Sequence, residues 1–305
     1  MADQLTFPTR GPARRPADRW AFVAFCAAMV ALICAIVLTS PFGPRRATAA
    51  LGGADGGRTV HRTGGAAGEA AADVPPDAPP PDSTNPALRR IAALGEPVYC
   101  GAGTRPLVAL TFDDGPGPYT QETIDLLRAN GMTATFFTVG KLYADPRFQG
   151  LLREEARLGA VGDHTWDHVS VDGMTRSELD AEIEHTRQVA SSDAGAPVFL
   201  FRPPLGQHDA GVDDYLRSHG MIDVLWSLDS EDSQGANAFQ IYRNVRDHLS
   251  PGDIVLLHEN RGTTQAALPR ILDLVRARGF QTVTVPQLLT MDPPSNEQLR
   301  SHTCP

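Results

Sequence analysis

The sequence predicts an α/β protein: a distorted (β/α)7, TIM-like barrel preceded by a transmembrane helix and a disordered tether. Three observations predict it. An uncharged apolar stretch lies near the N-terminus, a Gly/Ala- and Pro-rich stretch follows it, and from Val98 short apolar runs alternate with amphipathic ones. Such alternation predicts parallel strands covered by helices. The expected divisions are a cytoplasmic segment 1–19, a membrane anchor 20–40, a linker 41–97 and a folded domain 98–305.

The apolar stretch from Trp20 to Leu38 predicts the anchor. At a rise of about 1.5 Å per residue it nearly crosses a hydrocarbon core of about 30 Å. It is apolar on every face, which disfavours a buried globular helix. More arginines precede it (Arg10, Arg14, Arg15, Arg19) than follow it (Arg45, Arg46). This excess predicts a single-pass plasma-membrane protein whose remaining chain is extracytoplasmic.

A cleaved signal peptide is the alternative. The small residues of "ATAA" at 47–50 suit a signal peptidase, and cleavage near Ala49 would secrete the remaining chain. The apolar run is longer than a usual signal core, so we prefer an uncleaved anchor.

Residues 41–97 are rich in Gly, Ala and Pro and cannot bury enough apolar surface to fold, which predicts a tether. Cys100 and Cys304 lie at the two edges of the region after it. Disulfides persist outside the cytoplasm, and domain termini often lie close together. We therefore predict a Cys100–Cys304 disulfide, with two free thiols as the alternative.

The folded region divides into short apolar runs and amphipathic stretches. The runs predict seven strands, in "PLVALTF", "ATFFTV", "GAVG", "VFLF", "IDVLWSL", "DIVLL" and "QTVTV". The amphipathic stretches between them predict helices near 120–130, 147–158, 176–190, 210–219, 239–248 and 265–278. Seven strands suit an incomplete barrel better than a regular one of eight, and a doubly wound open sheet is the alternative. The tail from Pro293 is expected to lie on the surface as a strap.

The formal net charge of −9 argues against nucleic acid as a partner, because phosphate neutralisation needs a basic face. We expect a monomer.

Polar residues follow five of the predicted strands. Catalytic groups of a parallel β/α barrel come from the carboxyl ends of its strands. In chain order these residues are Asp113 and Asp114, His164 and His168, Arg202, Asp229 and Asp232, and His258. All five segments would open onto one rim of the barrel, which predicts an active site there.

His164 and His168 are four residues apart, so on a helical turn their imidazoles would face the same side. Two imidazoles and one carboxylate can hold a divalent cation and leave positions open. One of the paired aspartates would complete that set, and the other would be free to act as a base, kept ionised by nearby positive charge. Zn²⁺ is the expected ion, and Co²⁺ or Fe²⁺ would fit the same ligands.

The motifs "TFDDGP", "HTWDH", "RPPLG", "WSLDSED" and "IVLLH" occur in this order. Together they resemble the polysaccharide deacetylases with a NodB-homology domain, carbohydrate esterase family 4, over roughly Leu107 to Pro286. The resemblance implies that Asp114, His164 and His168 bind the metal.

It also implies the catalytic roles. Asp113 would be the general base, paired with Arg202. His258 would be the general acid that protonates the leaving amine, supported by Asp232 or, less well, by Asp229.

Three further positions would shape the substrate pocket. The Leu205 backbone N–H would join the metal in stabilising the oxyanion, and Leu256 and Trp226 would line the pocket for the acetyl methyl. The family often has an aromatic residue where Leu205 stands and a tryptophan where Ser233 stands, so the substrate groove departs from its pattern.

The resemblance, together with the predicted anchor, implies a membrane-tethered, metal-dependent N-deacetylase of an acetylated amino-sugar polymer. Cell-wall peptidoglycan is the preferred polymer, because an anchored extracytoplasmic chain meets the cell wall first, and a chitin-like glycan is the other. An O-deacetylase of the acetylxylan type is the alternative enzyme. A non-catalytic wall-binding module is disfavoured because no ligand or acid–base residue is lost. The remaining histidines of the folded region, His185, His208, His219, His248 and His302, are expected to be solvated.

Overall fold

The computed structural model describes residues 85–305. The predicted segments 1–19 and 20–40, and most of the predicted linker, lie outside the described residues. Among residues 85–305, no helix has both the length and the apolar character that a membrane span requires.

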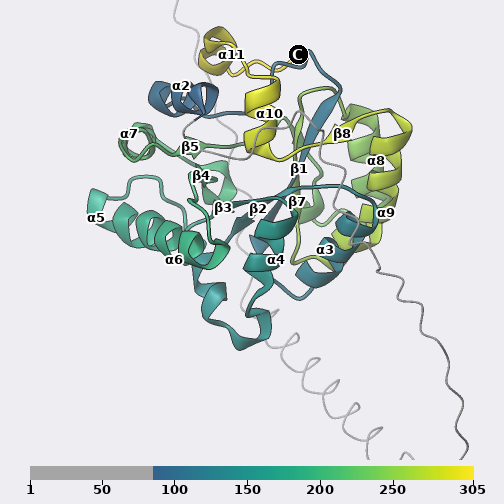
Figure 1. Cartoon of the computed structure of the whole chain (residues 1–305), viewed down its shortest axis with the longest axis horizontal. Helices are drawn as coiled ribbons and strands as arrows, with labels where there is room; N and C mark the ends of the chain where they lie inside the picture. Colours follow the sequence, from purple (N-terminus) through teal and green to yellow (C-terminus); the bar gives the residue numbers. More distant parts are fainter. Residues whose placement is uncertain (1–84) are drawn as a thin grey trace, which may run out of the picture. The chain divides into compact units, whose positions relative to one another are not determined.

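A curled sheet of parallel strands forms the centre of the domain (Figure 1). Its hydrogen-bonded path runs β5-β4-β3-β2-β1-β7-β6, and β8 pairs with β1. The strands are β1 (Leu107–Gly115), β2 (Thr135–Thr138), β3 (Ala160–Asp163), β4 (Leu200–Phe201), β5 (Ile222–Asp223), β6 (Leu228–Asp229), β7 (Ile254–His258) and β8 (Gln281–Thr282). The parallel curled sheet is consistent with the predicted distorted barrel.

Helices follow most of the strands. They are α2 (Pro86–Leu94), α3 (Thr120–Ala129), α4 (Leu151–Leu158), α5 (Arg176–Leu179), α6 (His185–Ala194), α7 (Ala210–Ser218), α8 (Ala238–His248), α9 (Gly262–Ala277), α10 (Val285–Met291) and α11 (Asn296–Ser301). One π-helical turn, Asp180–Glu184, joins α5 to α6, so the helix predicted near 176–190 is continuous but irregular. The described tail after Pro293 contains α11.

The structure differs from the predicted elements in one divided strand and in three helices that the sequence did not predict, α2, α10 and α11. The run "IDVLWSL" divides into β5 and β6, giving eight strands instead of seven. Residues 86–94, predicted to be linker, form α2: the Asn85 side chain accepts a hydrogen bond from the Ala87 N–H at 2.9 Å, and Leu88 and Ile91 are each 1% exposed. Burial of these two side chains against the barrel orders a segment whose composition alone resembles a tether.

The alternation of side chains along β1 decides which residues enter the barrel. Val108, Leu110 and Phe112 pack in one apolar cluster with residues of α3, α8 and α9, whereas Leu107 and Ala109 pack in another with residues of α10. Successive side chains of a strand point to opposite faces, so Asp113 lies on the same face as Leu107 and Ala109. The apolar pattern of β1 thus directs Asp113 to the interior.

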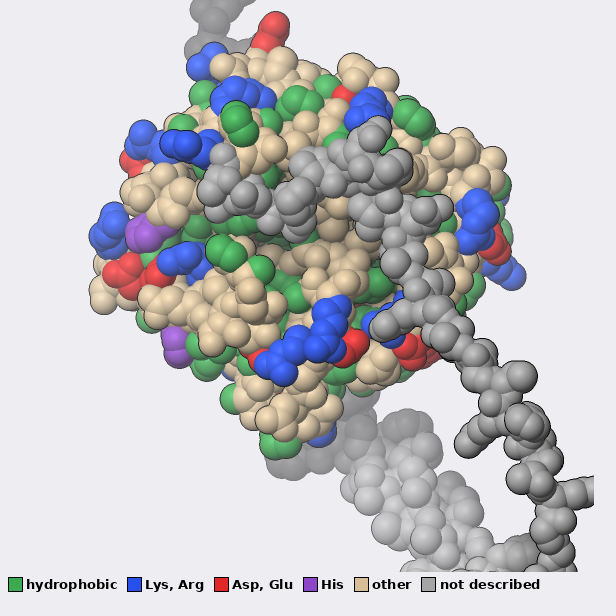
Figure 2. All heavy atoms as spheres, in the orientation of Figure 1, with side chains coloured by type: hydrophobic (Ala, Val, Ile, Leu, Met, Phe, Trp, Pro, Cys, Tyr) green, Lys and Arg blue, Asp and Glu red, His purple; other side chains and the backbone are tan. Residues whose placement is uncertain are grey.

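Charged side chains of both signs mix on the face shown in Figure 2. Several surface arginines pair with a neighbouring carboxylate, including Arg153 with Asp193 at 2.7 Å and Arg276 with Asp273 at 3.2 Å. Exposed pairs of this kind contribute little to stability. The stability of the domain therefore rests mainly on its buried layers.

Cys100 and Cys304 form a disulfide, with Cα atoms 5.9 Å apart and a sequence separation of 204 residues. It joins the segment before β1 to the segment after α11, and so ties the two ends of the described domain together.

We predict that Cys304→Ser lowers the free energy of unfolding by about 2–4 kcal/mol, because the unfolded chain regains the freedom that the cross-link removes. Urea unfolding measures this loss. Wild-type protein in dithiothreitol should then match the variant, which should not respond to the reductant. A wild-type midpoint that is unchanged by reduction would contradict the prediction.

Candidate active site

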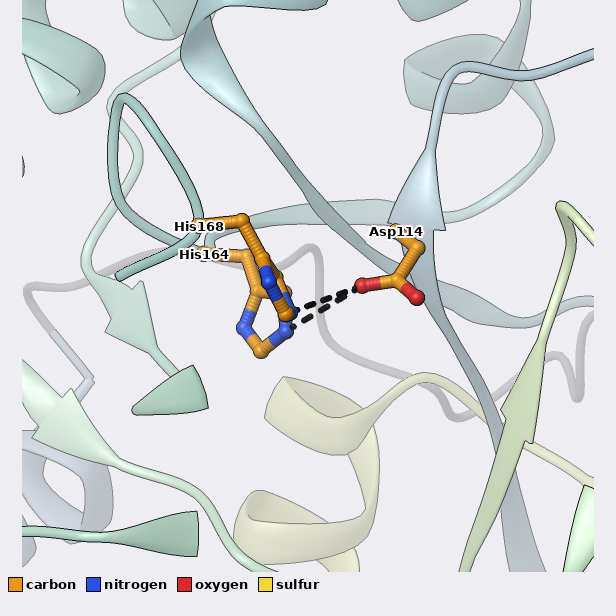
Figure 3. Close-up of side chains that lie close together, drawn as sticks. All are labelled: Asp114, His164 and His168. Atoms are coloured by element: carbon orange, nitrogen blue, oxygen red, sulfur yellow. Dashed lines mark ion pairs between the residues drawn. The ribbon is translucent and has the colours of Figure 1, made fainter. Parts of the chain in front are cut away.

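Asp114, His164 and His168 converge at the carboxyl ends of β1 and β3 (Figure 3). The Nε2 atom of His168 lies 3.0 Å from Asp114 Oδ1, and Nε2 of His164 lies 3.7 Å from the same oxygen. Figure 3 shows both imidazoles pointing toward the carboxylate. The predicted residues are therefore brought together, although residues 164–168 form a loop and not the expected helical turn.

The three side chains fit a divalent cation. The His164 Nδ1 lies 2.7 Å from the Arg202 carbonyl oxygen, which can only accept a hydrogen bond, so the lone pair of Nε2 is directed toward Asp114. Burial lowers the pKa of His164, which favours the neutral imidazole that a metal needs. Asp114 Oδ1 is buried and receives no well-oriented hydrogen bond from residues 85–305. Two nitrogens and this oxygen would hold the ion.

The Asp114 carboxyl is suited to remain ionised. Burial raises its pKa, but the contact with His168 and the charges of the nearby histidines outweigh burial and bring the pKa well below its usual range. Asn260 also donates from Nδ2 to Asp114 Oδ2 at 3.0 Å, which leaves Oδ1 directed toward the histidines.

Backbone strain accompanies these positions. Asp114, Thr165 and His168 have φ values of 68°, 68° and 58°, in the left-handed region that non-glycine residues rarely adopt. Buried Asp163 stabilises the histidine loop by accepting a hydrogen bond from the Thr165 N–H at 2.8 Å. This hydrogen bond supports the loop in its strained conformation.

A buried ion pair orients Asp113. The Arg202 side chain is fully buried, and its Nη1 donates to Asp113 Oδ1 at 2.7 Å and to Thr111 Oγ1 at 2.8 Å. Its Nε and Nη2 donate to the carbonyl oxygens of Val224 and Leu225, at 2.9 and 3.0 Å. Asp113 Oδ2 then lies 3.8 Å from His164 Nε2, beside the candidate metal ligands.

His258 lies opposite Asp113 in the register of β1 and β7. Its Nδ1 is 2.7 Å from Asp232 Oδ1, and its backbone N–H donates to Asp232 Oδ2 at 2.7 Å. Burial lowers the pKa of His258, but the hydrogen bond to Asp232 and the charges of Asp113, Asp232 and Asp114 outweigh burial, so its pKa is raised. Asp229, the other predicted partner, instead accepts from the Glu231 N–H at 2.7 Å.

The three predicted pocket residues have different environments. Leu256 is 4% exposed on β7, two residues before His258, so both side chains lie on the same face of that strand. Trp226 is half-buried with its ring 5.6 Å from the Arg202 guanidinium. Leu205 is 72% exposed and has a left-handed φ of 62°, in the turn Pro204–Gly206 that follows β4.

Several supporting residues escaped sequence reasoning. Asn260 follows His258 by two positions, and Glu259 between them is buried and accepts a hydrogen bond from Thr120. Burial raises the pKa of Glu259. The sequence feature that could have identified Glu259 and Asn260 is their position directly after β7, a strand that ends in His258.

Residues 101–224 match the polysaccharide deacetylase family, and the chain belongs to that family. Among curated relatives, a peptidoglycan-N-acetylglucosamine deacetylase of Bacillus cereus is 34% identical over 190 residues, covering 60% of this chain and 88% of the relative. A bifunctional xylanase/xylan deacetylase of Cellvibrio japonicus is 33% identical over 183 residues, which is 59% of this chain but 27% of the relative. This chain thus spans about a quarter of that relative's length.

Solved structures show the same fold. A family 4 carbohydrate esterase from Streptomyces lividans, in complex with acetate, aligns with a TM-score of 0.56 and 33% identity, covering 59% of this chain and 94% of the esterase.

We predict that Asp232→Asn lowers the pKa of His258, because the charged partner that favours the imidazolium is lost while burial remains. NMR titration of the His258 ring in metal-free protein measures the shift. Asp229→Asn is the matched control and should leave the His258 titration unchanged. An equal shift in both variants would refute the specific pairing with Asp232.

Proposed function

We propose that the chain is a metal-dependent hydrolase that removes N-acetyl groups from an acetylated amino-sugar polymer. The main support is one arrangement: a base candidate, Asp113, and an acid candidate, His258, lie on adjacent strands beside the Asp114, His164 and His168 group. Amide hydrolysis needs these parts, a base for water and an acid for the departing nitrogen.

A divalent cation held by Asp114, His164 and His168 would polarise the acetyl carbonyl and make water more acidic. Asp113, fixed by Arg202, would remove a proton from the attacking water. The water oxygen would bond to the acetyl carbon, and the C–N bond would break as His258 gives its proton to the nitrogen. Acetate and a free amine result. Asp232 would favour the protonated form of His258 and would orient its ring so that Nε2 can give the proton to the leaving nitrogen.

The pocket residues would complete the site. The Leu205 backbone N–H would donate to the developing oxyanion, and Leu256 and Trp226 would enclose the acetyl methyl.

Peptidoglycan is the proposed polymer, with a chitin-like glycan next. The name of the Bacillus cereus relative supports it, as does the expected extracytoplasmic location. O-deacetylation is the second candidate, because the Cellvibrio relative is named a xylan deacetylase and the same groups could attack an ester. N-deacetylation leaves a free amine on the product, whereas O-deacetylation leaves a free hydroxyl, so product analysis distinguishes the two reactions.

We also propose that residues 20–40 anchor a single-pass protein in the plasma membrane, with the domain outside the cytoplasm. The uncharged apolar stretch and the flanking arginines support the anchor. The Cys100–Cys304 disulfide suits an oxidising compartment.

We predict that Asp113→Asn reduces acetate release from peptidoglycan, chitooligosaccharide or acetylxylan by about 10²–10⁴-fold, because the base for water is lost. Bound metal, measured by mass spectrometry, should be retained at the Asp114 group. His168→Ala is expected to lose both activity and that metal, and a chelator should abolish wild-type turnover. Near-normal turnover by Asp113→Asn would mean that another residue is the base.

To test the location, we predict that the full chain sediments with membranes. The mature protein should also retain residues 1–20, because the anchor is not cleaved. Protease added to intact spheroplasts should release the folded domain, because it lies outside. N-terminal sequencing of the mature protein tests the alternative, a signal peptide that is cleaved near Ala49. A mature protein that starts near Ala49 would exclude the uncleaved anchor.

A further inference from the structure

A second group of metal-ligating side chains lies away from the Asp114 group. It consists of His208, Asp213 on α7 and Asp223 at the end of β5. Figure 1 shows α7 beside β5, the strand at one end of the sheet path. One ligand atom from each lies within 4.8 Å of the others. The His208 Nδ1 is 2.8 Å from Asp213 Oδ1 and 3.8 Å from Asp223 Oδ2. His208 is therefore not the isolated, solvated residue that the sequence suggested.

Asp223 is the unusual member of the group. It is 5% exposed, and neither carboxylate oxygen has a hydrogen-bond partner among residues 85–305. Arg202 directly follows the neighbouring strand β4, but its guanidinium donates to Asp113 and to the Val224 and Leu225 carbonyls instead. A buried carboxylate without a donor is costly unless a cation or a proton neutralises it. Its Oδ2 lies 3.8 Å from His208 Nδ1, too far for a hydrogen bond, so a cation held between these two atoms would supply the missing partner.

The donor set indicates which partner. One imidazole nitrogen and two carboxylates carry a combined charge of −2 when ionised, which balances a dication. Ca²⁺ and Mg²⁺ prefer oxygen ligands alone, whereas an imidazole beside carboxylates suits Zn²⁺, Mn²⁺ or Co²⁺. The side chains of His208 and Asp213 are 19% and 28% exposed, so an ion can reach the group from solvent.

We propose that His208, Asp213 and Asp223 form a second site for a divalent transition-metal ion, which shares no residue with the Asp114 group. The site joins three segments: the end of β5, helix α7 and the chain just after the Pro204–Gly206 turn. A bound ion would tie this turn, which holds Leu205, to the barrel. The ion serves as a cross-link and takes no part in the reaction.

The test is the Zn²⁺ stoichiometry of the metal-free full chain, measured by equilibrium dialysis. Wild-type protein should bind two equivalents. His168→Ala should keep the second site and bind one, and Asp223→Asn should keep the Asp114 group and bind one. The double variant should bind none. In the His168→Ala background, Asp223→Asn should weaken Zn²⁺ binding at least about 100-fold, because a ligand is lost outright.

Two further variants locate the ion. His208→Gln removes the nitrogen ligand from a partly exposed position and should also reduce wild-type stoichiometry to one. Asp214→Asn is the matched control: its carboxylate neighbours Asp213 in sequence but pairs with Arg217 at 2.6 Å, and two equivalents should remain. Retention of one equivalent by Asp223→Asn and His208→Gln also shows that each variant is folded.

One equivalent in wild type and none in His168→Ala would overturn the proposal, and Asp223 would then be neutralised by a proton. Two equivalents in Asp223→Asn would overturn it equally, because the second ion would lie elsewhere.

Discussion

The buried ion pair between Arg202 and Asp113 connects parts of the barrel that the strand order keeps apart. Arg202 follows β4, Asp113 lies on β1, and the two carbonyls that Arg202 also binds lie between β5 and β6. A fully buried guanidinium is costly unless its donors are used, and here they bind a carboxylate, a hydroxyl and two carbonyls. The Arg202 carbonyl in turn fixes His164, so one residue orients both the base candidate and a candidate metal ligand.

The buried hydrogen bonds and packed strands around the site offset the backbone strain within it. Left-handed backbone at a non-glycine residue costs about 1–3 kcal/mol, and it occurs at Asp114, His168 and Leu205. Asp114 lies near the end of β1, His168 lies in the loop where buried Asp163 accepts a hydrogen bond, and Leu205 lies in the turn after β4. The rigid barrel therefore holds side chains in directions that a relaxed loop would not keep.

The surroundings of His164 and His258 shift the pKa values of the two rings in opposite directions. His164 is buried, and its Nδ1 donates to a neutral carbonyl, so burial lowers its pKa and favours the neutral ring that can bind a metal. His258 donates to the Asp232 carboxylate, which raises its pKa and favours the proton-carrying ring. The proposed acid and ligand roles would therefore follow from the hydrogen-bond partner of each ring and not from residue type.

The sequence by itself determined the parallel α/β pattern and the strand ends that carry the site, because apolar runs and the polar residues after them are local features. It also grouped His164 and His168 with one of the paired aspartates, since parallel strands must bring their carboxyl ends to one rim. The choice of Asp114 over Asp113 came from the family resemblance. The preference for Asp232 over Asp229 rested on the family resemblance and not on any local pattern. The sequence could not place α2 in the fold or divide "IDVLWSL" into two strands. It did not connect His208 with Asp223 either. Only the tertiary structure decided these features, because each depends on contacts between residues that are distant in sequence. The periodicity of apolar residues along the chain does not determine which distant residues come into contact.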